Sequence, residues 1–254
     1  MLAKKRQSKI NELLLANGAV TVSELATLFG VSDETVRRDL IAMERCGELF
    51  RVHGGAVKES VMKPYLELEE RNQSYNEEKR ELSVTAMRFI EEGDIISLDC
   101  GSTAIVFANV LKESFSNLTV ITHSLDVFNV LKSKESFRII LCGGIYMPAE
   151  NTFYGALTID MITSLCAKKT FIFPSAVSLE SGICDYQPDL FQIQCQLIKS
   201  AEQVYVLADS SKLEKKAFLK IENMKSDFTY ITDSGISANL KQLYNENGIN
   251  IYTK

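Results

Sequence analysis

The stretch TVSELATLFGVSDETVRRDL, residues 21–40, carries the start and stop signals of two short consecutive helices. Thr21 and Glu24 have capping-box spacing, in which the hydroxyl accepts a hydrogen bond from a backbone amide and the carboxylate reaches back to the cap residue. Gly30 is a typical helix stop, and Ser32 is an N-cap followed by two acidic residues, which the helix dipole favours in a first turn. The stretch therefore predicts two helices joined by a tight turn.

The flanking segments complete a small domain. Residues 4–16 place their isoleucine and leucines on one helical face. Residues 48–57, ELFRVHGGAV, change to a strand-like pattern with paired glycines suited to the tip of a hairpin. The order helix, helix, tight turn, helix and hairpin over residues 1–58 is typical of a winged helix-turn-helix, so we expect a DNA-binding domain there.

The third helix has two chemically distinct sides. Val36, Leu40 and Met43 recur at helical spacing and are expected to be buried. Arg38 then lies roughly 200° around the helix from this stripe, and Arg37 lies about 100° from it. By itself the pattern is most simply a solvated helix with charge pairs four residues apart. In a helix-turn-helix, however, the outward side of this helix enters the major groove of DNA.

We expect the outward side of the third helix and the hairpin tip to contact DNA. Thr35 and Arg38 are placed to reach base edges. Ser32 and Arg37 are closer to the phosphates, and which of the two arginines reads a base stays open. His53 is either a phosphate or minor-groove contact or a turn residue bonded to its own backbone. The expected DNA-binding residues are Thr21, Ser23, Ser32, Glu34, Thr35, Arg37, Arg38, Arg51, His53, Gly54 and Gly55.

Charge is distributed unevenly along the 254 residues. The formal net charge is −5, which argues against a wholly basic coat for nucleic acid. Residues 1–58 hold nine Lys and Arg against seven Asp and Glu, a net charge of +2, and the remaining residues hold nineteen against twenty-six, a net charge of −7. The difference fits a small DNA-contacting module on an acidic body, to which Lys4, Lys5 and Arg6 are expected to add salt-dependent attraction.

The cysteines and the N-terminus predict an intracellular protein. Six cysteines are scattered without a Cys-x-x-Cys pair, and the chain has two histidines. Met1 is followed by a basic, amphipathic stretch rather than a secretory leader, and no run of about 20 apolar residues occurs. We therefore expect free thiols, a reducing cytoplasmic compartment, and neither a metal ion nor a cofactor.

The rest of the chain predicts a linker and a larger α/β domain. Residues 59–76 are polar and contain Pro64, which is typical of a linker. From residue 77 onward strand-like and helical segments alternate, so we expect an α/β domain with a mainly parallel sheet over residues 77–254. The expected strands are 95–98, 119–122, 137–142, 169–173, 203–208, 228–232 and 248–252. The expected helices are 77–91, 103–113, 125–132, 156–166 and 188–201.

Several loops at strand ends suggest a site for a small anion. In LDCGSTA, residues 98–104, a strand ends in Asp99 and a glycine leads into a helix that opens with Ser102 and Thr103. The amides and hydroxyls of such a helix start can bind an anion at the carboxyl edge of a sheet, although a capped helix with a structural glycine is the simpler interpretation of the motif alone. Further polar or glycine-rich loops would meet it at the same edge. They are Thr122-His123-Ser124, Cys142-Gly143-Gly144 and Asp209-Ser210-Ser211-Lys212.

These motifs resemble a known family. From TVSELATLFGV through TVRRDL to HGGA, the chain is similar to the N-terminal domain of DeoR-type bacterial transcription regulators. GDIISLDCGST, TVITHSL, LCGG, Gly155 and VLADSSK resemble the sensor domain of that family, so the resemblance spans nearly the whole chain. It implies a repressor, usually oligomeric, that binds operators near sugar-metabolism genes. It also implies control by a phosphorylated sugar, held in a Rossmann-like sheet domain of ribose-phosphate-isomerase type.

The resemblance and the strand-end loops together define an expected effector site. Its partners would be a small anionic effector, double-stranded operator DNA bound by the other domain, and further copies of the chain. The expected effector-binding residues are Asp99, Gly101, Ser102, Thr103, Thr122, His123, Ser124, Gly143, Gly144, Ser175, Asp209 and Lys212.

The chain departs from the family pattern at this site. His123 stands where the family usually has asparagine, and Ser175 lies in a Pro-Ser-Ala-Val loop where the family commonly has a glycine-containing loop. The next helix, around Gln194, lacks the Glu and the Lys/Arg pair that the family carries there. His123 could supply a replacement charge or a neutral hydrogen bond. The changes still predict a ligand site but weigh against a standard sugar phosphate.

Three functions fit these residues. The expected one is a ligand-responsive DNA-binding repressor that is not an enzyme. A second is a sugar-phosphate enzyme carrying a DNA-binding module, for which Asp99 and His123 are the only acid–base candidates. A third keeps the DNA-binding module and makes the α/β domain only an oligomerisation unit.

Overall fold

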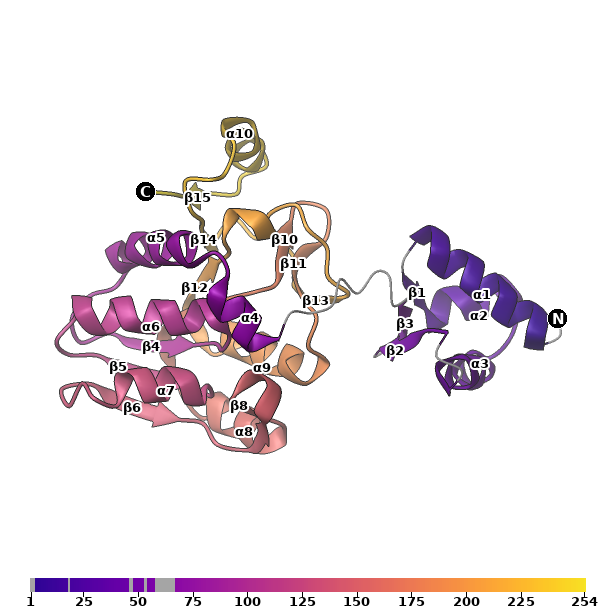
Figure 1. Cartoon of the computed structure of the whole chain (residues 1–254), viewed down its shortest axis with the longest axis horizontal. Helices are drawn as coiled ribbons and strands as arrows, with labels where there is room; N and C mark the ends of the chain where they lie inside the picture. Colours follow the sequence, from indigo (N-terminus) through magenta and orange to yellow (C-terminus); the bar gives the residue numbers. More distant parts are fainter. Residues whose placement is uncertain (1–2, 18, 46–47, 53, 58–66) are drawn as a thin grey trace. The chain divides into compact units, whose positions relative to one another are not determined.

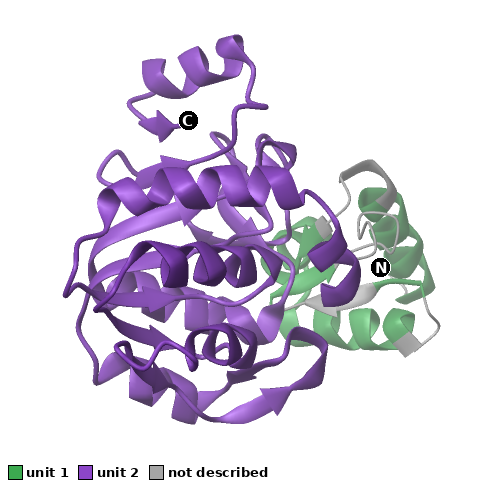
Figure 2. Ribbon diagram, turned by 60° about the vertical axis from the view of Figure 1, so that its left-hand side comes forward, with its two compact units in different colours: residues 1–66 green, residues 67–254 purple. Residues whose placement is uncertain are grey.

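The chain folds into two compact units. The computed structural model describes residues 3–17, 19–45, 48–52, 54–57 and 67–254. Unit 1 is Met1–Leu66 and unit 2 is Glu67–Lys254 (Figures 1 and 2). In the described part of the chain, no helix combines the length and apolar character that a membrane span requires.

Unit 1 confirms the predicted winged helix-turn-helix. The hairpin is extended by a strand that the sequence pattern did not reveal, because β1 is only three residues long and runs directly into the next helix. The three strands form an antiparallel sheet in the order β1-β3-β2. The elements are α1 (Ala3–Asn17), β1 (Ala19–Thr21), α2 (Val22–Phe29), α3 (Asp33–Arg45), β2 (Phe50–Val52) and β3 (Gly55–Val57).

The core of unit 1 is built from the predicted stripe of α3. Val36, Leu40 and Met43 are buried and pack with apolar residues of α1, α2 and the small sheet. The predicted capping box is present: the Glu24 amide donates to Thr21 Oγ1 over 3.2 Å, and the Thr21 amide donates to Glu24 Oε2 over 3.1 Å. These local signals fix where α2 begins and which side of α3 faces outward.

A buried ion pair ties α1 to α3. Arg6 Nε lies 2.6 Å from Asp39 Oδ2 and Arg6 Nη2 lies 3.2 Å from Asp39 Oδ1, and both residues are buried. The structure thus differs from the expectation that Arg6 adds to the DNA-facing charge, because its guanidinium is held inside unit 1. Lys4 and Lys5 are exposed, as that expectation requires.

We predict that Arg6→Ala destabilises unit 1 by about 3–5 kcal/mol, because it leaves the Asp39 carboxylate buried without its cation. Lys5→Ala is the matched control, since Lys5 is exposed on the same helix. The measurement is hydrogen exchange of the α3 amides in the full chain, with protection lost in the first variant and kept in the second. Equal protection in both variants would show that the ion pair does not hold α1 to α3.

Unit 2 contains the predicted parallel sheet. Its seven strands lie in the order β15-β14-β12-β9-β4-β5-β6, and every neighbouring pair is parallel. The strands are β4 (Ile95–Leu98), β5 (Thr119–Thr122), β6 (Arg138–Leu141), β9 (Ala167–Ile172), β12 (Ala201–Leu207), β14 (Thr229–Ile231) and β15 (Ile251–Tyr252). From β4 the chain builds the sheet outward through β5 and β6, and then returns to the other side of β4 with β9. The strand order therefore reverses between β4 and β9.

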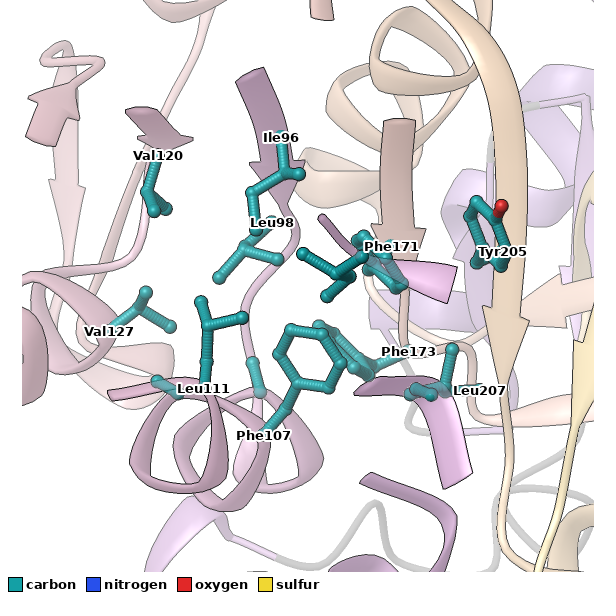
Figure 3. Close-up of a cluster of buried hydrophobic side chains, with 14 of the residues drawn as sticks. Ile96, Leu98, Phe107, Leu111, Val120, Val127, Phe171, Phe173, Tyr205 and Leu207 are labelled. Carbon is teal, nitrogen blue, oxygen red and sulfur yellow. The ribbon is translucent and has the colours of Figure 1, made fainter. Parts of the chain in front are cut away.

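Helices cover both faces of this sheet. One face packs against α5, α6 and α7, and Figure 3 shows Phe107 of α6 close to Phe171 and Phe173, with ring centroids 4.9 and 5.5 Å away. On the other face, α8 and α9 contribute to one buried cluster, and α9 and α10 to a second. In β5, β9, β12 and β14, successive residues belong to clusters on opposite faces, which is why both faces of the sheet are apolar there. The helices are α5 (Asn76–Ala86), α6 (Ser102–Ser114), α7 (Leu125–Leu131), α8 (Ala156–Thr163), α9 (Pro188–Lys199) and α10 (Ala238–Glu246).

Unit 2 also contains elements that the sequence analysis did not predict. A short helix, α4 (Leu68–Gln73), lies within the expected linker, where Leu68 is buried. Two small antiparallel sheets have the orders β7-β8 and β10-β11-β13, and their strands are three or four residues long, which is too short for a clear alternation. These strands are β7 (Ile145–Met147), β8 (Thr152–Tyr154), β10 (Ala176–Ser178), β11 (Gly182–Asp185) and β13 (Leu219–Glu222).

Candidate functional site

The outward side of α3 is polar and exposed. Ser32, Glu34, Arg37 and Arg38 are all exposed, and the side chain of Arg38 is 78% exposed. Arg38 Nε lies 3.4 Å from Glu34 Oε1, which is an exposed pair of the kind that contributes little free energy and can readily exchange partners. Thr35 is half-buried, with its hydroxyl 3.0 Å from that of Ser32. The predicted residues of α3 thus share one accessible surface.

The other predicted DNA-binding residues have mixed positions. Thr21 and Ser23 are exposed at the start of α2, and Gly54 is exposed in the turn before β3 with a φ of +88°. Gly55 is buried, and a Cβ added there would lie 2.1 Å from the carbonyl oxygen of Val20. The close approach of β3 to β1 therefore explains why a glycine is needed here. The backbone of Arg51 lies in β2, and Arg51's side chain and all of His53 are outside the described residues.

In unit 2, the predicted Asp99 is the centre of a buried hydrogen-bond network at the point where the strand order reverses. Its Oδ1 accepts from the Cys100 amide over 2.8 Å and lies 3.3 Å from His123 Nε2. Its Oδ2 accepts from Gln194 Nε2 over 3.1 Å and from the Phe173 amide over 3.4 Å. A carboxylate has about four lone-pair sites, so these four partners account for its full capacity. Ligands in open α/β sheets bind at this kind of reversal point.

His123 lies in the loop after β5, and its side chain contacts Asp99. Its Nδ1 is 2.9 Å from the carbonyl oxygen of Phe153, and its Nε2 faces Asp99. A carbonyl and a carboxylate only accept, so both contacts are hydrogen bonds when each ring nitrogen carries a proton. The Thr152 hydroxyl also lies 2.9 Å from Nδ1, so a neutral ring that donates from Nε2 to Asp99 can accept from Thr152. Both roles expected for His123 are therefore compatible with its contacts.

A second buried carboxylate joins this network through Gln194. Asp185, at the end of β11, accepts from Gln194 Nε2 over 2.9 Å and from the hydroxyl of the predicted residue Ser175 over 2.8 Å. Burial raises the pKa of Asp185, and the charge of Asp99 raises it further, while its hydrogen bonds lower it. The neutral amide of Gln194 therefore separates two carboxylates that would otherwise repel each other. Asp185 and this role of Gln194 were not predicted, since Asp185 lies in a three-stranded sheet that the sequence did not reveal.

One group of metal-ligating side chains lies at the same place. Within the described residues, Asp99, Cys100 and His123 each offer a donor atom, all buried and within 4.8 Å of one another. Protein donors already occupy the lone pairs of Asp99 that a metal ion would need. The absence of a metal therefore stays a prediction from sequence, with these three residues as the place to look for one.

The remaining predicted loops lie at the same carboxyl edge of the sheet but have local structural roles. Thr122 Oγ1 accepts from the Ser124 amide over 3.1 Å, and Ser124 Oγ caps α7 through the Val127 amide at 3.3 Å. The carbonyl of Gly143 accepts from Thr158 of α8, and a Cβ on Gly144 would collide with that threonine. These contacts explain the serine, the threonine and the glycines without a ligand.

Two cations that were not predicted, Lys79 and Arg71, join the predicted Lys212 near the start of α6. Lys79 of α5 is buried, and burial lowers its pKa to about 8, with Lys212 lowering it, Asp209 raising it and Arg71 lowering it. Lys212 Nζ lies 3.6 Å from Asp209 Oδ2. Arg71 Nη1 lies 3.6 Å from the position that a Cβ on Gly101 would take. The stretch of α9 around Gln194 has no cation, and the positive charge in this region comes from α4, α5 and the predicted Lys212.

Buried oxygen atoms without a hydrogen-bond partner also gather in this region. Among the described residues, they include Thr103 Oγ1 in the first turn of α6, Gln194 Oε1 and Asp209 Oδ2. An unsatisfied buried polar atom costs about 1–3 kcal/mol. Asp209 Oδ2 has the Lys212 ammonium 3.6 Å away, and Gln194 Oε1 only accepts, so the Thr103 hydroxyl is the one of the three that could donate to an anion. Two of the three belong to the predicted effector set.

We predict that Gln194→Glu destabilises unit 2 in a pH-dependent way, because it adds a third carboxyl between Asp99 and Asp185. Burial and these neighbours would raise the pKa of the new carboxyl, as they raise that of Asp185. A carboxyl whose pKa is raised by folding costs nothing below its unfolded pKa of about 4.3, and the cost grows as the pH rises through the folded value. We expect a loss of about 3 kcal/mol at pH 7.5, or roughly 10 °C, and a smaller loss at pH 5.

The measurement is thermal unfolding of the full chain at both pH values. Gln192→Glu is the matched control, because Gln192 is exposed on the same helix and its substitution should leave the melting temperature within about 1 °C. A loss that is equal at pH 5 and pH 7.5 would exclude charge repulsion as its cause.

Two family profiles match the chain. One, described as the DeoR-like helix-turn-helix domain, matches residues 6–60, and the other, described as the DeoR C terminal sensor domain, matches residues 74–234. The uncharacterized HTH-type transcriptional regulator YulB of Bacillus subtilis is 32% identical over 244 residues, which is 96% of this chain and 94% of the relative. The lactose phosphotransferase system repressor of Lactococcus lactis is 33% identical, covering 93% of each chain. The transcriptional repressor GlcR of Bacillus subtilis is 29% identical, covering 99% of this chain and 96% of that one.

Solved structures resemble part of the chain. Ribose 5-phosphate isomerase A from Neisseria gonorrhoeae aligns with a TM-score of 0.42 and 15% identity, covering 56% of each chain. The eIF2B beta subunit from Chaetomium thermophilum aligns with a TM-score of 0.41 and 14% identity, covering 56% of this chain and 41% of that one.

Proposed function

The chain belongs to the DeoR family of transcriptional regulators, and from this premise we propose that it is a repressor of a carbohydrate-metabolism operon whose DNA binding responds to a small anionic metabolite. The observation that carries the proposal is the pairing of two surfaces in one chain. Unit 1 has an exposed polar side on its recognition helix, and unit 2 has a buried polar network with neighbouring cations at the reversal point of a parallel sheet. The relative named as the lactose phosphotransferase system repressor supports the operon class, and GlcR, named as a transcriptional repressor, supports repression.

The proposed reading surface on DNA is the outward side of α3. Arg38 projects furthest from the buried stripe, so it reads a base edge, and Arg37 at the flank contacts phosphate. Ser32, Glu34 and Thr35 lie in the same first turns, and Thr21, Ser23 and Gly54 supply backbone-positioning contacts from the neighbouring elements. Arg51, His53 and Gly55 stay in the proposed DNA-binding set from the sequence pattern of the wing.

The proposed effector is a compact metabolite with at least one anionic group. The first turn of α6 offers backbone amides and the unpartnered Thr103 hydroxyl, and Lys212 and Arg71 supply positive charge nearby. Asp99 and His123 stay in the proposed effector-binding set as positioning residues, because their hydrogen bonds to each other and to the surrounding loops fix the turn that leads into this anion-binding end. Catalysis is not part of the proposal, because Asp99 is held by four hydrogen-bonding partners and is poorly suited to accept a substrate proton.

We predict that Arg38→Ala lowers the ratio of the affinities for operator and unrelated DNA by roughly 10-fold or more, because a base-edge contact is lost. Arg37→Ala is the matched comparison, since it removes an exposed arginine from the same helix. It should weaken binding to all sequences alike and lower the slope of log affinity against log salt concentration by about 1. The measurement is the affinity for duplexes selected by the wild-type protein and for random duplexes, over a series of salt concentrations. If Arg38→Ala weakens both duplexes equally, Arg38 is a phosphate contact instead.

We predict that a phosphorylated sugar, a phosphorylated polyol or a small sugar acid raises the melting temperature of the protein by a few degrees. A ligand at 100 times its Kd stabilises the folded state by about 2.7 kcal/mol. The measurement is thermal unfolding across a panel of these compounds, with the corresponding neutral sugars as controls. A shift with neutral sugars alone would remove the anionic group from the proposal, and no shift with any compound would remove the ligand.

A further inference from the structure

Helix α4 brings an arginine to the start of α6. Arg71 Nη2 lies 2.6 Å from both carboxylate oxygens of Glu150, which is buried and follows β7 in a short 3-10 turn (Pro148–Glu150). The other terminal nitrogen, Nη1, is the atom that would lie 3.6 Å from a Cβ on Gly101. The guanidinium therefore spans from Glu150 to the turn that opens α6.

That turn has the features of an anion site. Gly101 has a φ of +104°, so its backbone takes a conformation that only glycine adopts easily, and a side chain there would stand beside Arg71. Helix α6 is 13 residues long and begins immediately afterwards with Ser102 and Thr103, both buried. An independent sign of a ligand is the Thr103 hydroxyl oxygen, which is buried in this first turn and has no hydrogen-bond partner.

Three cations lie close together at Arg71, with the carboxylates of Glu150 and Asp209 as counter-ions of two of them. Lys79 Nζ donates to the carbonyl oxygens of Arg71 and, over 2.6 Å, of Ser74, so a buried cation holds the C-terminal end of α4. Lys212 is close enough to Lys79 to lower its pKa, and only part of this repulsion is offset by Asp209. A bound anion would relieve the mutual repulsion of three cations drawn from α4, α5 and the loop after β12.

We propose that Arg71 is an effector-binding residue, with Nη2 kept on Glu150 and Nη1 bound to a phosphoryl group held at the first turn of α6. The inference rests on the proposed function in taking the effector to be an anion. In this arrangement Glu150 is a positioning residue that fixes the guanidinium. Because α4 is the first described element after residues 58–66, the ligand would fasten the helix from which the chain leads to the DNA-binding unit.

The proposed contacts at position 71 require an arginine and cannot be made by a lysine. Lysine can keep the charge and the pairing with Glu150, but a single ammonium group cannot reach both Glu150 and the anion as a planar guanidinium does. Arg71→Lys should thus keep the fold and lose the anion contact. Arg80→Lys is the matched control, because Arg80 is exposed on α5 nearby. Arg71→Gln combined with Glu150→Gln removes both charges of the pair, so it leaves no buried carboxylate without a cation.

The experiment is calorimetric titration of the full chain and these variants with inorganic phosphate and with the phosphorylated sugars of the thermal panel. We expect Arg80→Lys to bind like the wild type. The affinity of Arg71→Lys and of the double variant should fall by about 10-fold or more. Binding of equal strength by the wild type and both Arg71 variants would overturn the role of Arg71 while leaving an anionic effector intact. No binding of any of these anions by the wild type would overturn the proposed effector, and this inference with it.

A second measurement tests whether the bound ligand stabilises α4. Hydrogen exchange of the amides of residues 68–73 should slow when phosphate is added to the wild type and to Arg80→Lys, and should not change in Arg71→Lys. Phosphate that binds without slowing this exchange would overturn the link between the ligand and α4.

Discussion

The buried carboxylate of Asp99 is the interaction on which the rest of unit 2's site depends. Its four partners come from four separate segments: the start of the loop after β4, the loop after β5, the loop after β9, and helix α9. A buried charge is costly unless hydrogen bonds satisfy it, so Asp99 constrains all four segments to meet at one point. That point is where the strand order of the sheet reverses, and the candidate ligand site forms around it.

The chemistry around Asp99 gives structural roles to His123 and Gln194, two positions where the sequence is expected to depart from the family pattern. A second buried carboxylate, Asp185, lies on the other side of Gln194, and the side-chain amide donates to both. A carboxylate in place of Gln194 would face two like charges, and the imidazole of His123 lies within hydrogen-bond distance of Asp99. Positive charge for an anion is found in α4, α5 and the loop after β12, and not in the stretch of α9 around Gln194.

Much of the fold could be predicted from sequence because it is encoded locally. The capping box at Thr21 and Glu24, the buried stripe through Leu40, and the alternating apolar strands each express one short-range rule, and each is present in the structure. The elements that were missed are short: β1 has three residues and α4 has six, so neither repeats its period often enough to give a clear pattern. From the sequence, Arg6 was assigned to the DNA-facing charge together with Lys4 and Lys5. Nothing in the local sequence shows whether such an arginine is exposed or paired with a distant residue such as Asp39.

The sequence by itself determined that a winged helix-turn-helix precedes a parallel α/β domain, which side of α3 faces outward, and which loops lie at the carboxyl edge of the sheet. These features follow from periodicity and capping, which act over a few residues. Only the tertiary structure decided which charged groups meet. Arg71 and Glu150 are 79 positions apart, and Asp99 and Gln194 are 95 apart. Such pairs are selected by the cost of burying a charge without a partner, and that cost arises only once the chain has folded.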